Sequence, residues 1–137
     1  MNVVLDTNVL VSALKTQGGN CALILDLAIE GTLNLAVDQR ILAEYERVCH
    51  DPRLKLDVET VRTALDFVRD TAERVVPLPS AVELPDAADR PFLEVAEQAG
   101  AVLVTGNKKH FPARACRAVR VFSPAEFVEE LRKRTLA

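Results

Sequence analysis

Aromatic residues are scarce in this chain: its 137 residues include no Trp, one Tyr and five Phe. The apolar fraction is nevertheless 49%, which excludes a disordered chain. A core must therefore be built mainly from Val, Leu, Ile and Ala. Because domains usually contain ~100–200 residues, we expect one domain that spans residues 1–137.

Cysteine is also rare, and the chain has only Cys21, Cys49 and Cys116. This odd number without a CxxC pair argues against a disulfide framework and against a Cys-based zinc site. We expect all three to be small buried side chains. The start of the chain lacks a signal-type segment, and no apolar run approaches the ~18 residues that cross a bilayer. We therefore expect a cytoplasmic protein without membrane contact.

Positive charge is not in excess, because the net charge is −3. A protein that binds duplex DNA through a broad basic face usually carries the opposite sign, although local basic patches on an acidic protein can still bind nucleic acid. The chain also lacks the HExxH, nucleophile-elbow, GxGxxG and P-loop motifs. Zincins, α/β-hydrolases, dinucleotide-binding enzymes and P-loop enzymes are thereby excluded. The charge balance suits a concentrated acidic site.

Apolar runs alternate with amphipathic segments along the chain. Continuous apolar runs predict buried strands at residues 2–5, 33–37, 101–105 and 119–122. Helical periodicity predicts helices near 7–14, 21–30, 39–50, 57–72 and 88–99, and a last one from Ser123-Pro124 onward. Three prolines make 77–87 a loop. Strands that alternate with helices predict an α/β fold, a three-layer α/β/α sandwich with a central parallel sheet.

Acidic residues occur where such a sheet binds ligands, at the carboxyl ends of its strands. Asp6 follows the first strand, Glu44 borders the apolar face of its helix, and Asp86 and Asp89 open the helix near residue 88. Each has a plainer explanation. The three aspartates can simply cap helix N-termini, and Glu44 can extend outward past the edge of the core.

The strand at 101–105 is followed by Gly-Asn-Lys-Lys-His, residues 106–110. Gly106 and Asn107 suit an ordinary turn, and the two lysines suit solvent. His110, like His50, is expected to be a turn or surface residue more than a metal ligand.

Four segments in this order resemble the PIN-domain family, and in particular the VapC-like toxins of toxin–antitoxin systems. They are Val3 to Leu10 (VVLDTNVL), Ile41 to Tyr45 (ILAEY), Asp89 to Ala96 (DRPFLEVA) and Ala101 to Asn107 (AVLVTGN). The resemblance runs from Met1 to the helix start at Ser123. It implies a PIN-like fold for the whole chain and a metal-dependent endoribonuclease that hydrolyses phosphodiester bonds in single-stranded RNA.

The resemblance also implies the site residues. The acidic quartet of the family falls on Asp6, Glu44, Asp89 and Asn107. Asp6 and Asp89 would bind Mg²⁺ or Mn²⁺, which prefer oxygen ligands, and Glu44 would hold a water molecule beside the ion. The supporting residues would be Asn8, Thr105 and Asp86.

The chain departs from the family pattern at one place. It has Thr-Gly-Asn at 105–107 where the family usually has Thr-Gly-Asp, so Asn107 brings no charge. We therefore expect weaker metal binding or a single-metal site. An alternative is a catalytically weak module that binds RNA or a partner protein. A receiver-like domain with Asp6 as phosphate acceptor is a further alternative, but receivers need an acidic pair at the first strand.

Partners follow from the resemblance and from basic residues near the last motif. Lys108 and Lys109, with Arg114, Arg117 and Arg120, can meet RNA phosphates, or they can be plain solvated charges. The run Arg132-Lys133-Arg134 is better explained as stabilising the end of its own helix. The resemblance implies a cognate antitoxin protein and a homodimer.

Overall fold

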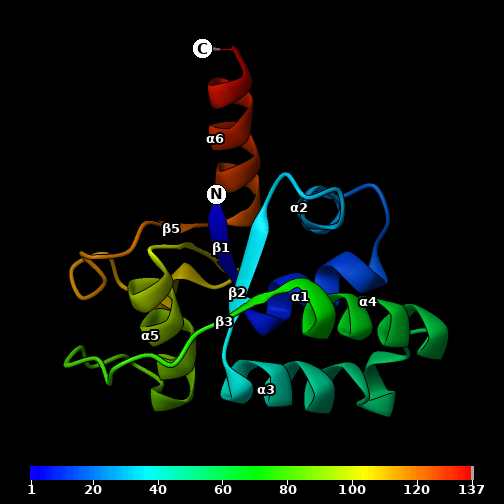
Figure 1. Cartoon of the computed structure of the whole chain (residues 1–137), viewed down its shortest axis with the longest axis horizontal. Coiled ribbons are helices and arrows are strands. Elements are labelled where there is room, and N and C mark those ends of the chain that lie inside the picture. The colour runs from blue at the N-terminus through cyan, green and yellow to red at the C-terminus, as the bar shows by residue number, and fades with distance from the viewer. Residues whose placement is uncertain (137) are drawn as a thin grey trace.

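Five parallel strands form the centre of the structure, a computed structural model that describes residues 1–136 (Figure 1). Their spatial order is β3 (Glu73–Arg74), β2 (Asn34–Val37), β1 (Asn2–Leu5), β4 (Val102–Val104) and β5 (Val121–Phe122). β1 is paired on both edges, with Val3 opposite both Leu35 and Val102. Because β1 is central and buried on both faces, its continuous apolar run has no alternation.

Helices cover both faces of this sheet. They are α1 (Thr7–Lys15), α2 (Asn20–Ile29), α3 (Gln39–Cys49), α4 (Val58–Thr71), α5 (Arg90–Ala99) and α6 (Pro124–Leu136). Figure 1 shows α5 on one side of the strands and α1 to α4 on the other. α5 packs on β1, β2 and β4, whereas α6 packs on α2 and β5. The predicted three-layer α/β/α arrangement is confirmed.

The core is aliphatic, as composition predicts, but the few aromatic residues hold central places in it. Tyr45, Phe92, Phe111 and Phe127 are among the largest fully buried side chains. The Tyr45 hydroxyl donates a hydrogen bond of 2.5 Å to the carbonyl oxygen of Leu5. This bond ties α3 to the carboxyl end of β1, the edge where Asp6 follows.

Some predicted boundaries were wrong. β3 was not predicted, because its two residues are charged and exposed and leave no apolar run to detect. The helix expected at 88–99 starts at Arg90, after a short 3₁₀ helix at Ala87–Asp89. The last strand is limited to Val121–Phe122. Residues 75–86 form neither helix nor strand, which confirms the proline-based prediction of a loop.

The cysteines follow the prediction in part. Cys49 and Cys116 are buried, whereas Cys21 is only partly buried, and all three are free thiols. None of the helices within residues 1–136 has the length and apolar character that a bilayer crossing requires.

Candidate metal centre

Asp6 stands at the centre of the carboxyl edge of the sheet and is only 5% exposed. Its Oδ1 accepts a hydrogen bond from the Thr7 N–H at 2.8 Å, so it does cap α1. Its Oδ2 accepts hydrogen bonds from Thr105 Oγ1 at 2.7 Å and from Asn8 Nδ2 at 3.2 Å. A carboxylate offers about four acceptor sites, so this buried group retains capacity for a further ligand.

Thr105 and Asn8 are themselves fixed by the segment after β4. The Asn107 N–H donates to Thr105 Oγ1 at 3.0 Å, and the Gly106 N–H donates to Asn8 Oδ1 at 2.9 Å. A Cβ at position 106 would lie 3.1 Å from Asn8 Oδ1, so glycine lets this segment approach closely. Asn8 and Thr105 therefore orient the Asp6 carboxylate, as the resemblance implies.

Glu44 projects from α3 toward the same edge. Its Oε2 accepts a hydrogen bond from the Thr7 hydroxyl, and its Oε1 lies 3.6 Å from Arg47 Nη2. The side chain is 28% exposed. Thr7 thus contacts two carboxylates, Asp6 through its N–H and Glu44 through its hydroxyl. The Thr7 hydroxyl therefore places the Glu44 carboxylate at the start of α1, directly after Asp6, while the partial exposure agrees with a position at the edge of the core.

Asp86 and Asp89 behave differently at the start of α5. Asp86 Oδ1 accepts from the Ala88 N–H at 2.9 Å, which is the capping role that we considered for it. Asp89 makes no side-chain capping bond. Its side chain is 14% exposed, and its Oδ2 is a buried atom without a hydrogen-bond donor among the described residues. His110 Nδ1 lies 2.9 Å from that oxygen, as an ion pair if the ring is protonated.

The charge of Glu44 acts on Asp6, and the charge of Asp6 acts on Asp89. Burial raises the pKa of Asp6, and the nearby Glu44 charge raises it further. Burial also raises the pKa of Asp89 to about 6, and the Asp6 charge adds to that effect. Carboxylates so placed resist ionisation together, and a divalent cation relieves that repulsion. The oxygen-rich donor set fits Mg²⁺ or Mn²⁺, and Asp89 Oδ2 is a buried oxygen whose one polar contact among the described residues is His110.

The other predicted residues lie around this group. Asn107 is partly buried, and its backbone carbonyl accepts from the His110 N–H at 3.1 Å. Lys109 is exposed, whereas Lys108 Nζ pairs with Glu126 Oε1 at 2.9 Å. Arg120 pairs with Glu130 at 3.2 Å and lies over the Phe122 ring. Lys109 is therefore better placed for an RNA phosphate than Lys108 or Arg120.

Sequence reasoning missed a cluster that His110 forms with Asp86 and Asp89, without Asp6 or Glu44. Asp86, Asp89 and His110 each offer one ligand atom, and these atoms all lie within 4.8 Å of one another. His110 does lie in a short turn, the 3₁₀ helix Lys108–His110, as we expected. Its contact with Asp89 depends on how this turn approaches α5, which no local pattern in the sequence reveals.

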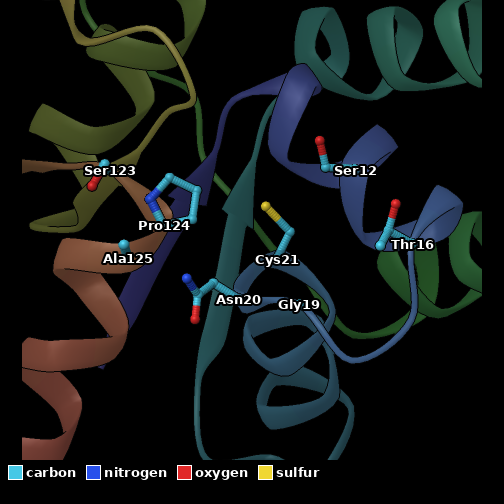
Figure 2. Close-up of a pocket in the computed structure, with 8 residues that line it drawn as sticks. All are labelled: Ser12, Thr16, Gly19, Asn20, Cys21, Ser123, Pro124 and Ala125. Atoms are coloured by element: carbon cyan, nitrogen blue, oxygen red, sulfur yellow. The ribbon is translucent and has the colours of Figure 1, made fainter.

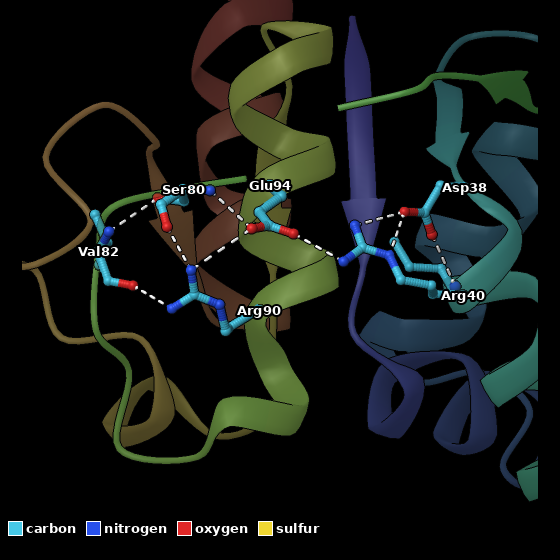
Figure 3. Close-up of polar contacts among 7 residues, drawn as sticks. Asp38, Arg40, Ser80, Val82, Arg90 and Glu94 are labelled. Carbon is cyan, nitrogen blue, oxygen red and sulfur yellow. Dashed lines mark hydrogen bonds and ion pairs between the residues drawn. The ribbon is translucent and has the colours of Figure 1, made fainter. Parts of the chain in front are cut away.

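Sequence reasoning also missed a polar network around Glu94, a buried residue of α5. Figure 3 shows the Glu94 carboxylate between two arginines. It accepts from Arg40 Nη1 at 2.8 Å and from the Ser80 N–H at 2.7 Å, and Arg90 lies 3.7 Å away. Burial opposes ionisation of Glu94, but the Ser80 N–H and Arg40 hold its pKa below the ordinary value.

The two arginines extend this network in opposite directions (Figure 3). Arg40 also pairs with Asp38 at 2.7 Å, at the end of β2. Arg90 donates to the Val82 carbonyl at 2.8 Å and to the Ser80 carbonyl. These bonds hold the loop at 75–86 against α5 through Arg90, the residue directly after Asp89.

One hollow of the surface, between α1, α2 and the start of α6, does not supply cation ligands of this kind (Figure 2). It is lined by Ser12, Thr16, Gly19, Asn20, Cys21, Ser123, Pro124 and Ala125. Cys21 is its only ionisable side chain, so the acidic edge of the sheet is the better candidate site.

Comparison with known proteins agrees with this geometry. A family model described as "PIN domain" matches residues 2–109. Uncharacterized protein MJ1680 of Methanocaldococcus jannaschii is 28% identical over 144 aligned positions, which cover 97% of this chain and 93% of that protein.

Solved structures share the fold at lower identity. VapBC2 from Rickettsia felis, solved with a DNA fragment from its promoter, has a TM-score of 0.60 and 19% identity. FitAcB from Neisseria gonorrhoeae has a TM-score of 0.59 and 21% identity. Each alignment covers 90% of this chain and 98% of the other. These likenesses concern the fold, and the family model settles the assignment against a receiver-like domain. The chain belongs to the PIN-domain family.

Proposed function

We propose that this protein is a metal-dependent endoribonuclease that cleaves single-stranded RNA and serves as the toxin of a toxin–antitoxin pair. The observation that carries the proposal is the Asp6 carboxylate, buried and electrostatically coupled to both Glu44 and Asp89. PIN domains are generally nucleases, and proteins of similar fold include VapBC2 and FitAcB. A cytoplasmic location accords with this function.

Asp6 and Asp89 are the proposed ligands of Mg²⁺ or Mn²⁺. Thr105 and Asn8 hold the Asp6 carboxylate in one orientation by hydrogen bonds, and its oxygens can still accept a metal ion. Asp89 contributes the buried oxygen that faces His110 Nδ1. When bound, such an ion offsets charge on phosphate oxygens and lowers the pKa of an attacking water.

The remaining residues have positioning or proton-transfer roles in this proposal. Glu44 holds the attacking water and accepts its proton, and the Thr7 hydroxyl fixes the carboxylate for that purpose. Asn107 supplies an uncharged side chain beside them. Asp86 keeps the turn before α5 in place through the Ala88 N–H.

Contacts with partners are proposed from the same edge of the sheet. The exposed Lys109 meets an RNA phosphate, while Lys108 remains bound to Glu126. An antitoxin would cover the acidic group with an Arg or Lys side chain, and the toxin would act as a homodimer. Co-expression with the cognate antitoxin should suppress cleavage, and purified protein should elute as a dimer in size-exclusion chromatography.

The direct test is cleavage of a fluorescent single-stranded RNA with Mn²⁺ or Mg²⁺. The wild type should cleave, and Asp6→Asn should lower the rate at least ~100-fold, a barrier increase of about 3 kcal/mol. Asp70→Asn is the matched control, because Asp70 is an exposed aspartate on α4. Cleavage that survives both Asp6→Asn and a chelator would refute the proposal.

Asn107 supports a second candidate function, a catalytically weak module that binds RNA or a partner protein. The side chain at this position brings no charge to the acidic group. If this candidate is correct, the wild type binds RNA without turnover, and Asn107→Asp introduces cleavage. Efficient turnover by the wild type would eliminate it.

A further inference from the structure

The position of His110 points to a ligand that the acidic quartet does not include. We infer that His110 binds the metal ion directly through Nδ1, next to Asp89, and that this nitrogen makes the site prefer Mn²⁺ over Mg²⁺. The inference rests on the proposed metal-dependent function and specifies the ion that the site selects.

The distance between the two groups suits neighbouring ligands of one ion. His110 Nδ1 lies 2.9 Å from Asp89 Oδ2. Two adjacent ligands of an octahedral ion, each at ~2.1 Å, are ~3.0 Å apart. The pair therefore has nearly the spacing that coordination requires. Asp86, whose ligand atom lies within 4.8 Å of both, can add a third contact after a small movement or through water.

The state of Asp89 Oδ2 is the second observation. This atom is buried, and its one polar contact among the described residues is His110 Nδ1 at 2.9 Å, which is an ion pair only when the ring is protonated. When Nδ1 carries no proton, two lone pairs face each other and the carboxylate oxygen lacks a donor, and a buried oxygen without a donor calls for a partner such as a bound ion. A cation between the carboxylate and the imidazole would provide that partner.

The backbone holds the imidazole at this place. The His110 N–H donates to the Asn107 carbonyl at 3.1 Å, and the next residue, Phe111, is buried in the core. The same short turn therefore carries both the neutral Asn107 and His110. A neutral nitrogen ligand at position 110 takes the place of the carboxylate ligand that position 107 lacks.

The chemistry of the donors predicts the selectivity. Carboxylates, carbonyls and water suit Mg²⁺ and Mn²⁺ alike, whereas imidazole suits transition metals. Mg²⁺ demands near-ideal octahedral oxygen ligation and dehydrates reluctantly. A site with one imidazole and two or three carboxylates should therefore bind Mn²⁺ more tightly than Mg²⁺.

The test uses pulsed electron paramagnetic resonance of the purified protein with one equivalent of Mn²⁺. A directly bound imidazole should give ¹⁴N modulation of the Mn²⁺ echo. His110→Gln should abolish that modulation. His50→Gln is the matched control, because His50 is the only other histidine, lies exposed at the end of α3, and should leave the signal unchanged.

Calorimetric titrations provide the second measurement. His110→Gln should weaken Mn²⁺ binding at least ~10-fold, the lower end of the loss when a metal site is perturbed, and Mg²⁺ binding less than ~3-fold. An equal loss for both ions would overturn the inference, because it would assign His110 a purely structural role. If His110→Gln does not fold, His110→Asp replaces it and should bind Mn²⁺ without the ¹⁴N signal.

The outcomes separate this inference from the proposed function. Mn²⁺ that binds and supports RNA cleavage without ¹⁴N modulation overturns the assignment of His110 and leaves the nuclease proposal intact. Absence of Mn²⁺ binding together with absence of metal-dependent cleavage overturns both. A ¹⁴N signal that persists in His110→Gln but disappears in His50→Gln would assign the imidazole ligand to His50 and would also overturn the assignment of His110.

Discussion

Thr105 Oγ1 donates a hydrogen bond of 2.7 Å to Asp6 Oδ2, although 99 positions separate the two residues in the chain. Thr105 is fully buried and Asp6 nearly so. The bond links the carboxyl ends of β1 and β4, which pair directly, with Leu5 opposite Val104. Strand pairing therefore determines the orientation of the proposed metal ligand.

Thr105→Val tests that relationship. Valine keeps the shape of threonine but removes the donor to Asp6 and the acceptor for the Asn107 N–H. We expect a loss of about 1–3 kcal/mol in the free energy of unfolding, because buried polar groups lose their partners. Urea denaturation and Mn²⁺ titration check this result. Thr63→Val on the exposed face of α4 is the control, and equal effects of both variants would contradict the prediction.

Stability in the absence of divalent ions should fall with rising pH through the titration of Asp89. Its pKa is about 6 in the folded protein and 3.8 in the reference state, so between those values the native state binds more protons than the unfolded state. By linkage, this residue contributes nothing below pH 3.8, opposes folding increasingly between pH 3.8 and about 6, and carries its full penalty above that range. Asp89→Asn should therefore gain about 1–2 kcal/mol over the wild type at pH 7–8 and little at pH 4.

Urea denaturation of both proteins at several pH values in a chelator measures that difference. Other groups titrate in the same range, so the quantity to follow is the variant minus the wild type. A difference that does not change with pH would show that the Asp89 charge is not destabilising.

Divalent ions should offset the destabilisation that the ionised Asp89 carboxylate causes at neutral pH. Saturation with Mn²⁺ at ~100 times its dissociation constant should stabilise the wild type at pH 7 by about 2.7 kcal/mol. Asp6→Asn should lose most of that gain, whereas Asp70→Asn should keep it. Thermal unfolding with and without Mn²⁺ provides the measurement, and an equal shift in all three proteins would indicate binding elsewhere.

Glu94→Gln should loosen the loop at 75–86. The substitution removes the charge between Arg40 and Arg90 but retains an amide oxygen, and Arg40 is 47% exposed, so water compensates part of the loss. We expect a cost of about 1–3 kcal/mol and faster hydrogen exchange at Ser80 and Val82. Glu97→Gln, exposed on the same helix, is the control. Unchanged exchange at Ser80 would show that the network does not hold the loop.

The sequence predicts the residues whose places follow from strand ends. Asp6 and Thr105 each stand directly after a continuous apolar run, so parallel pairing brings them to one edge. The edge strand β3 has no such run, because its residues are charged and exposed and only its backbone is paired. Its existence depends on β2, and a local pattern does not contain that information.

The same distinction explains what was missed at the candidate site. Glu44 was detectable because helical periodicity places it beside apolar residues. His110 and Glu94 make contacts across turns and loops, where the spacing along the chain says little about direction. Glu94 lies among the buried residues of α5, and only its partners Arg40 and Ser80 show why a charge is tolerated there.

The pairing of β1 with β4 also has a consequence for biosynthesis. A nascent chain that has emerged only as far as residue 100 already contains Asp6, Glu44 and Asp89, but it lacks the strand that begins at Val102. Asp6 then has no hydroxyl donor, and the glycine that contacts Asn8 has not yet emerged from the ribosome. Under the proposed function, an incomplete translation product should therefore be inert, and RNA cleavage by this chain should begin only once its synthesis is nearly finished.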